Sequence, residues 1–412
     1  MLNWVKLAFR NILRNKRRSF VTLLAIGVGF AAISLFRGYT DATYNALRQT
    51  AVRGEGLAHL TVAKQGWFEK GKLDPQQYMF LEEDVQRIIK LIKEEPDVLV
   101  ATPQIMIAGL VSNGTVSTIF VAQGVIPKED KIIKGIFSSY GPIKGAALDD
   151  QKMYGVEMSR GLAEFLGLEA GKDGVAMAAT LNGQMNAMDI QVIGVYETGT
   201  DMTNDKFMRV NYGFAQALYD AKMAEKVVVL LDDWRKTDSM RIRLLDKLTR
   251  AGFNCDIKTW NELSIFYSKV KAMFDSIFFF LFTIVMIIVV MSTVNTMGMA
   301  VLERTREIGT LRALGLKRRG VNLLFALEGG LLGLCGSLFG MFLHVATWAV
   351  IRIFQPTYTP PGTSISVPMV VHLVPQVMVV LMACLIVLSL MAAVIPARRA
   401  AGQKVVDALW HV

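Results

Sequence analysis

Cysteine and histidine are scarce in this chain of 412 residues, which carries three cysteines and four histidines. Cys335 and Cys384 lie in long apolar stretches, which leaves only Cys255 in the polar middle of the sequence. No disulfide can form within that middle region, so its stability must come from a hydrophobic core. The histidines are scattered through different segments, and no His or Cys has the spacing of a metal site.

Motifs for hydrolysis and nucleotide binding are also missing. The sequence has no Gly-x-Ser-x-Gly elbow. The run from Gly167 to Asp173 is similar to a phosphate-binding loop, but it has three residues between its glycines where four are needed. Asp173 also stands where a Ser or Thr would bind magnesium. We therefore interpret the run as a turn, and predict that the chain is not an enzyme and holds no cofactor of its own.

Charged residues are absent from long stretches, although they make up 19% of the chain. A helix needs about 20 apolar residues to cross a bilayer. Three stretches are suitable: residues 19–38, 276–302 and 320–351. A last region, 353–397, has no Asp, Glu, Lys or Arg and is too long for one crossing. Prolines break its first part, so we predict a helix at 376–396. The sequence therefore predicts an integral membrane α-helical protein with four transmembrane helices.

Basic residues gather beside these spans and predict their orientation. Residues 1–18 hold six Lys or Arg and no acid, residues 302–319 hold six and two Glu, and residues 398–412 hold three and one Asp. Residues 37–275 are nearly neutral, with 29 basic and 31 acidic residues. The positive-inside rule then predicts cytoplasmic N- and C-termini and an extracytoplasmic domain between the first two spans. A nucleic-acid-binding protein would carry its charge on a folded domain, so no nucleic-acid partner is expected.

The terminal segments and the last loop are assigned on the same basis. Residues 1–18 are predicted to form a cytoplasmic amphipathic helix at the membrane interface, because apolar residues recur at helical spacing from Trp4 to Leu13. No small-residue cleavage site follows, so we expect a retained signal anchor. The remaining segments are an extracytoplasmic loop at 352–375 and a cytoplasmic tail at 397–412.

The region between the first two spans, 39–270, is predicted to be a large mixed α+β domain. Asn113-Gly114 and Asn182-Gly183 each separate two β-prone runs, which predicts two hairpins. A helix from about Asn261 is predicted to run directly into the second span. Such a helix would join the domain rigidly to the membrane.

The loop at 303–319 is the most informative segment of the sequence. It is compatible with a helix in which Glu303 pairs with Arg306, and Gly315 suits a helix stop. A short amphipathic helix between two spans is a docking element for a cytoplasmic partner. The alternative is that its charges only orient the spans. Its predicted apolar face consists of Ile308, Leu311 and Leu314.

The run from Glu303 to Gly315 resembles the cytoplasmic helix of the FtsX-like/MacB-type ABC transporter permeases, a family that includes the lipoprotein-releasing LolC/LolE subunits. The segments 10–19 and 396–409 are also similar to that family, with Val405 in place of a usual proline. The resemblance covers essentially the whole chain. It implies that the ATPase-coupling residues are Glu303, Arg304, Arg306, Glu307, Ile308, Gly309, Leu311, Arg312 and Gly315.

The resemblance also implies a location and a set of partners. It places the chain in the bacterial cytoplasmic (inner) membrane, in a dimer with a second permease copy or a paralogue. Because the sequence begins at the membrane, we expect a separate ABC ATPase subunit, which would bind ATP and Mg. The ATPase would move the 303–315 helix and, through the second span, the outer domain, a scheme called mechanotransmission. A periplasmic carrier or adaptor and membrane lipid are further expected partners, and a β-rich insertion is expected at about 126–212.

Two functions fit this resemblance. The permease would export or extract a lipoprotein, a peptide or an amphiphile. Alternatively, it would be an FtsX-like relay that activates an extracytoplasmic cell-wall hydrolase without transport. The large size of the outer domain favours the transporter. The cytoplasmic helix motif argues against a third class, an ATPase-independent receptor or adhesion protein.

The third span carries polar and small residues of its own. Glu328 is a candidate intramembrane polar site, because an acid inside a span is costly and usually faces the bundle interior or water. It has either a substrate or coupling role or, in the interpretation that we favour, a hydrogen-bonded packing role near the cytoplasmic edge. We interpret His344 as structural or interfacial. Close packing against a helix of this chain or of a second subunit is predicted by Gly329, Gly333, Gly336 and Gly340.

Overall fold

The computed structural model describes residues 2–14, 16–71, 73–135, 144–198, 201–359 and 366–402. The chain forms two compact units. The first, the helical bundle, contains Met1–Tyr44, Val270–Thr357 and Pro368–Val412. The second, the α/β domain, contains Asn45–Lys269 and Tyr358–Val367.

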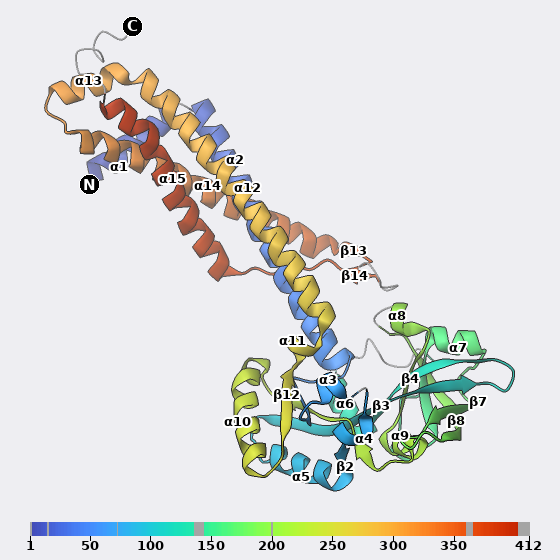
Figure 1. Cartoon of the computed structure of the whole chain (residues 1–412). Helices are drawn as coiled ribbons and strands as arrows, with labels where there is room; N and C mark the ends of the chain where they lie inside the picture. Colours follow the sequence, from blue (N-terminus) through green and yellow to red (C-terminus); the bar gives the residue numbers. More distant parts are fainter. Residues whose placement is uncertain are drawn as a thin grey trace. The chain divides into compact units, whose positions relative to one another are not determined.

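Long helices make up the helical bundle (Figure 1). Within the described ranges, four helices are long and apolar enough to cross a membrane, which confirms the predicted number of spans. They are α2 (Lys16–Gln49), α12 (Ile265–Glu303), α14 (Arg318–Phe354) and α15 (Pro375–Gly402). The shorter helices are α1 (Leu2–Arg14) and α13 (Thr305–Ala313). Each long helix extends beyond the apolar stretch from which it was predicted.

Glycines bring α14 close to two neighbouring helices. A Cβ atom added at Gly340 would lie 2.5 Å from the carbonyl oxygen of Gly27 on α2. A Cβ atom added at Gly329 would lie 2.6 Å from the carbonyl oxygen of Ser389 on α15. Such close backbone contacts are typical of small residues in membrane helices. The predicted close packing is therefore confirmed, and these two glycines pack against helices of this chain.

The segment before α15 is attached to α2 at a glycine. The N–H of His372 donates to the carbonyl oxygen of Gly38 at 3.0 Å, and its Nδ1 lies 2.8 Å from Oδ2 of Asp41. Val371 is buried beside them. A Cβ atom at Gly38 would collide with the carbonyl oxygen of His372. Glycine at this position therefore allows the connection between α14 and α15 to lie directly on α2.

The α/β domain contains a ten-stranded sheet in the part of the chain that the structure describes (Figure 1). Its strand order is β12-β1-β11-β3-β4-β9-β6-β8-β5, and β7 pairs with β3 and β8. The strands are β1 (Leu60–Lys64), β3 (Val98–Ser112), β4 (Ser117–Val125), β5 (Lys144–Gly145), β6 (Gly155–Ser159), β7 (Asp173–Ala179), β8 (Met185–Tyr196), β9 (Phe207–Asn211), β11 (Lys226–Leu231) and β12 (Cys255–Thr259). Other short strands form separate pairs: β2 (Phe80–Leu81) with β10 (Met223–Ala224), and β13 (Thr357–Tyr358) with β14 (Val367–Pro368).

The helices of this domain are short and amphipathic or lie in connections. They are α3 (Trp67–Lys70), α4 (Pro75–Tyr78), α5 (Glu82–Lys93), α6 (Pro127–Lys134), α7 (Arg160–Leu166), α8 (Asp201–Asn204), α9 (Tyr212–Tyr219), α10 (Thr237–Arg250) and α11 (Trp260–Leu263). α5 buries Ile88 and Ile92, and α9 buries Phe214, in one hydrophobic core with strand residues such as Ile105 and Phe120. Cys255 joins this core as a free thiol.

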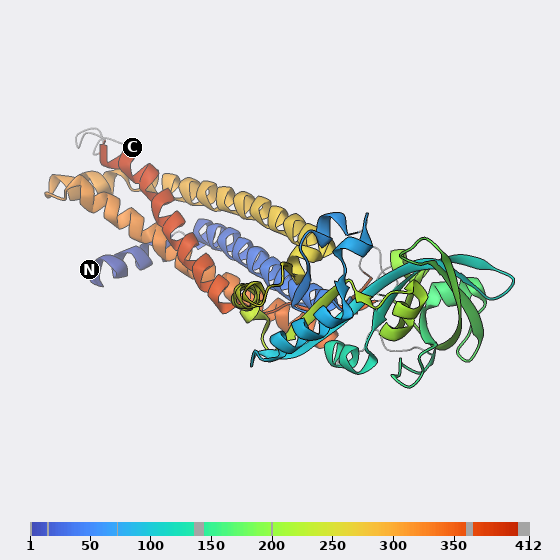
Figure 2. The same ribbon diagram turned by 60° about the horizontal axis from the view of Figure 1, so that its bottom comes forward.

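Both predicted hairpins are confirmed. Figure 2 shows the long strands β3, β4, β7 and β8 running together, and β3–β4 and β7–β8 are antiparallel pairs. The turn glycines Gly114 and Gly183 have φ of +94° and +81°, which glycine adopts without strain. The region 126–212, expected to be a β-rich insertion, contains β5 to β9. It shares the main sheet, because β9 pairs with β4 and β7 pairs with β3.

The prediction of one continuous helix from about Asn261 into the second span is wrong. α11 ends at Leu263, and Ser264 leaves the helical conformation with φ −79° and ψ 89°. The hydroxyl of Ser264 then accepts a hydrogen bond from the N–H of Tyr267. This bond caps the start of α12. A capping box of Thr259 and Glu262 fixes α11 as a separate turn. These local caps interrupt a sequence that is otherwise suitable for a helix.

His59 is expected to make the stability of the α/β domain depend on pH. It is 7% exposed, and its Nδ1 accepts the N–H of Leu231 at 2.9 Å. Burial, with the nearby positive charges of Arg53 and Arg48, lowers the pKa of His59 from 6.5 to about 4. Between these pH values the unfolded state binds a proton that the folded state does not. The domain is therefore expected to lose about 3 kcal/mol of stability as the pH falls from about 6.5 to about 4.

The variant His59→Asn tests this expectation, because asparagine offers an acceptor but does not titrate. The opening free energy of the α/β domain is measured in the full chain by hydrogen exchange of β11. It should fall more steeply with acid in the wild type than in His59→Asn. Parallel curves for the two proteins would show that another group controls the acid sensitivity.

Candidate coupling site

The loop between the second and third spans forms a bent helix at one end of the bundle (Figure 1). α12 ends at Glu303, and Arg304 interrupts the helix with φ −112° and ψ 15°. α13 then covers Thr305–Ala313, a shorter segment than the 303–319 loop in which the coupling helix was expected. Gly315 has φ +99°, and the N–H of Leu316 donates to the carbonyl oxygen of Leu311. The helix therefore ends just before Gly315, the residue that predicted the helix stop.

The coupling residues lie on two sides of this helix. Ile308 and Gly309 are buried, and Ile308 packs in a cluster with Phe325 of α14 and Ala397 of α15. Leu311 is 41% exposed and Leu314 80% exposed. The predicted common apolar face is therefore divided, with Ile308 towards the bundle and the two leucines outward. Among the remaining residues Arg312 is half-buried, and the exposed ones are Glu303, Arg306, Glu307 and Gly315.

Two exposed ion pairs join the N-terminal segment to this loop. Nη1 of Arg14 lies 3.0 Å from Oε1 of Glu307, and Nη1 of Arg18 lies 2.5 Å from Oε1 of Glu303. The bend at Arg304 places Glu303 and Arg306 on different helices, and the structure pairs Glu303 with Arg18. Exposed pairs of this kind contribute about 0–1 kcal/mol each.

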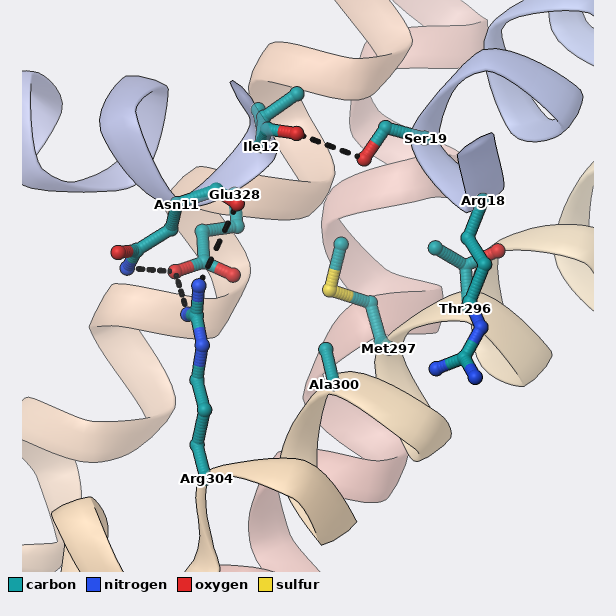
Figure 3. Close-up of a pocket in the computed structure, with 9 residues that line it drawn as sticks. All are labelled: Asn11, Ile12, Arg18, Ser19, Thr296, Met297, Ala300, Arg304 and Glu328. Carbon is teal, nitrogen blue, oxygen red and sulfur yellow. Dashed lines mark hydrogen bonds and ion pairs between the residues drawn. The ribbon is translucent and has the colours of Figure 1, made fainter. Parts of the chain in front are cut away.

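A third interaction is buried, and it contains Glu328 (Figure 3). Glu328 is 2% exposed and Arg304 is 6% exposed. Nη1 of Arg304 lies 3.1 Å from Oε1 of Glu328, and Nδ2 of Asn11 donates to the same oxygen at 2.5 Å. Nη2 of Arg304 donates to the backbone carbonyl oxygen of Asn11 at 3.4 Å. Residues of α1, the α12–α13 bend and α14 therefore meet at one carboxylate.

A cavity of about 20 Å³ lies beside this carboxylate, close to the volume of one water molecule. The hydroxyl of Ser19, another lining residue, donates to the carbonyl oxygen of Ile12 at 3.1 Å. The cavity is lined by Asn11, Ile12, Arg18, Ser19, Thr296, Met297, Ala300, Arg304 and Glu328 (Figure 3). Throughout the described segments, no group of three or more His, Cys, Asp or Glu is placed to hold a metal ion. The arrangement is suited to holding helices together.

His344 lies elsewhere in the bundle, on the α14 side that faces α2. It is fully buried, and its Nδ1 lies 2.8 Å from the hydroxyl oxygen of Ser34. This contact joins the first and third spans, as a structural histidine would. Asn11, Arg14 and Arg18 were not assigned to the coupling site from sequence. Arg14 and Arg18 lie 293 and 285 positions from their partners, and only the opposite charges of the two segments could have indicated the pairing.

Four membrane-crossing helices, with a large α/β domain inserted after the first and a short charged helix between the second and third, define a multi-pass membrane protein of the permease class. Models of two protein families match the chain. The MacB-like periplasmic core domain matches residues 19–244, and the FtsX-like permease C-terminal model matches residues 279–405. The first match covers more than half of the sequence, so the chain belongs to the FtsX-like/MacB-type family of ABC transporter permeases.

Curated relatives agree with this family. The "lipoprotein-releasing system transmembrane protein LolC" of Neisseria meningitidis serogroup B is 23% identical over 430 residues, with 99% of this chain and 98% of the relative covered. LolC of Xylella fastidiosa is 25% identical, with 97% of each chain covered. The "macrolide export ATP-binding/permease protein MacB" of Salmonella typhimurium is 24% identical over 85% of this chain, and the match spans only 53% of that relative.

Two solved structures are similar to part of the chain. The extracellular domain of the transporter YknZ, from Gram-positive bacteria, shares 16% identity with a TM-score of 0.34, covering 49% of this chain and 99% of that one. The periplasmic region of MacB from Actinobacillus actinomycetemcomitans shares 14% identity with a TM-score of 0.35, covering 50% of this chain and 89% of that one.

Proposed function

We propose that this chain is the permease subunit of a MacB/LolCDE-type ABC transporter, which couples ATP hydrolysis by a separate ATPase to extracytoplasmic movement. Its substrate class would be a lipoprotein, a peptide or an amphiphile, which it exports or extracts. The relatives named for lipoprotein release and macrolide export support a transporter, and they do not favour the hydrolase-activating relay. The basic flanking segments support an inner-membrane orientation with cytoplasmic termini.

The observation that carries this proposal is the two-sided construction of α13. Its inner side packs into the bundle through Ile308, while Leu311 and Leu314 stay exposed on a helix that carries its own charges. Protein interfaces have an apolar centre with a polar rim, and the exposed leucines together with the charges of α13 have this composition. We propose that the ATPase docks on this outer side, with Arg306 at its margin.

Movement of α13 would pass to the membrane helices in this mechanism. α12 is one helix from Ile265 to Glu303, so a displacement at its Glu303 end acts along its whole length. The permease would act in a dimer with a second copy or a paralogue, with a periplasmic carrier or adaptor beyond the membrane. ATP and Mg would bind in the ATPase and not in this chain.

Introducing charge on the outer side of α13 tests this function. The double variant Leu311→Glu/Leu314→Glu is expected to retain the co-purifying ATPase at least about tenfold less well than the wild type, because both anchors are lost from the interface. The amount of ATPase bound to the tagged full chain in lipid nanodiscs measures the effect. Leu245→Glu is the matched control, because Leu245 is 42% exposed on α10 of the α/β domain. Equal ATPase retention by both variants would contradict docking at α13.

A further inference from the structure

Arg304 belongs to the coupling motif but does not lie on its exposed side. The residue is 6% exposed, compared with 41% for Leu311. From the bend between α12 and α13 it extends into the bundle towards Glu328 (Figure 3). A side chain buried to this extent cannot contribute to a surface that receives a partner protein. Arg304 must therefore act on another part of the permease.

Arg304, Glu328 and Asn11 form a closed set of three hydrogen bonds. Arg304 donates to the Glu328 carboxylate, Asn11 donates to the same oxygen, and Arg304 donates to the backbone of Asn11. Each member comes from a different segment: α1, the α12–α13 bend and α14. If α13 rotated about its bend, the guanidinium would lose a partner from at least one of the other two segments.

Burial makes this set stiffer than the exposed pairs around it. Charged groups removed from water are stable only while they remain paired, and an acid inside a membrane span is especially costly to leave alone. The Arg14–Glu307 pair has side chains 67% and 53% exposed, so water can replace either partner. The exposed pairs can therefore open at little cost while the buried set stays closed.

We propose that Arg304, Glu328 and Asn11 form a positioning clamp that fixes the orientation of α13 on the bundle. The clamp transmits ATPase movement to α14 and α1, and it is not needed for ATPase binding. In the clamp, Glu328 contributes to coupling by holding Arg304. Both are therefore positioning residues. The inference rests on the proposed function, because it requires an ATPase that docks on α13.

The test separates binding from transmission in the full chain with its co-purifying ATPase in lipid nanodiscs. One measurement is the amount of ATPase retained. The other is the change in hydrogen exchange of the α/β domain when ATP, Mg and vanadate are added. Glu328→Gln and Arg304→Gln are expected to retain the ATPase within about fivefold of the wild type, because the exposed side of α13 is intact. Both are expected to lose the nucleotide-dependent change in the α/β domain.

Arg319→Gln is the matched control, because it removes an exposed arginine at the start of α14. It should keep the nucleotide-dependent change. The double variant Arg304→Met/Glu328→Met guards against misfolding, since apolar residues replace both buried charges and none is left unpaired. It is expected to bind the ATPase and to lack the change.

A wild-type response in Glu328→Gln and in the methionine double variant would overturn the clamp. Loss of ATPase from Glu328→Gln as severe as in Leu311→Glu/Leu314→Glu would also overturn it, because Glu328 would then support docking itself. A wild-type chain that retains no ATPase would overturn the proposed function, and the clamp with it. The two failures are distinguishable, because the first appears only in the variants.

Discussion

Replacing Arg209 with alanine is expected to destabilise the α/β domain by about 3–5 kcal/mol. Arg209 on β9 is 6% exposed, and its Nη1 lies 2.6 Å from Oε2 of Glu157 on β6. Its Nη2 contacts Asp130 of α6, which also lies 3.4 Å from Nζ of Lys134. Burial disfavours the charged guanidinium, yet Asp130 and Glu157 outweigh this effect and raise the pKa of Arg209. Without Arg209, two buried carboxylates would share a single lysine.

Native-state hydrogen exchange of β6 and β9 in the full chain measures this loss as a change in opening free energy. Arg250→Ala is the control, because Arg250 is 79% exposed and pairs with Asp246 on the surface of α10. It should cost no more than about 1 kcal/mol. Adding Asp130→Asn and Glu157→Gln to Arg209→Met is expected to recover part of the stability, because no buried carboxylate remains. Equal costs for Arg209→Ala and Arg250→Ala would contradict this account.

Gly340→Ala is expected to destabilise the helical bundle by about 1–3 kcal/mol. The added methyl group would lie 2.5 Å from the carbonyl oxygen of Gly27 and 2.7 Å from Cβ of Phe30. Both atoms are part of α2 or fixed directly to it, so α2 and α14 must move apart to accept the change. The separation would also weaken the neighbouring contact between Ser34 and His344.

Thermal unfolding of the full chain in lipid nanodiscs measures this effect. Gly298→Ala is a matched control, since it makes the same substitution on α12 where an added Cβ would meet no atom within 4 Å. Alanine is the better helix former, so Gly298→Ala should leave the midpoint unchanged or raise it slightly. A midpoint for Gly340→Ala as high as that of Gly298→Ala would show that α2 and α14 do not pack as described.

Features that depend on neighbouring residues were predictable from the sequence. Asn113-Gly114 and Asn182-Gly183 predicted their hairpins, because each turn needs a residue with positive φ, which the glycine supplies. The four spans followed from the lengths of their apolar stretches. Gly315 marked a helix stop for the same local reason. In each case the residues that decide the structure belong to one continuous stretch of the sequence.

Features that depend on distant partners were not predictable. Ile308 and Leu311 are three residues apart and suggested one apolar face, yet the boundary of the bundle passes between them. That boundary depends on how α13 is rotated about its axis. Arg304 precedes α13 and Glu328 lies on α14, so their contact joins residues on the two sides of the loop. Arg209 and Asp130 are likewise 79 positions apart, and no local pattern indicates that their charges are neutralised together.

The position of β1 has a consequence for synthesis of the protein. β1 is the first strand of the α/β domain, and its two neighbours in the sheet are β11 and β12, the last strands of the domain's main sheet. While the chain is being made, both edges of β1 stay without hydrogen-bond partners until almost the whole domain has been translated. Pairing across so long a loop is slow and leaves an aggregation-prone edge open. This interval ends only when β12, which lies just before α11 and α12, has been made.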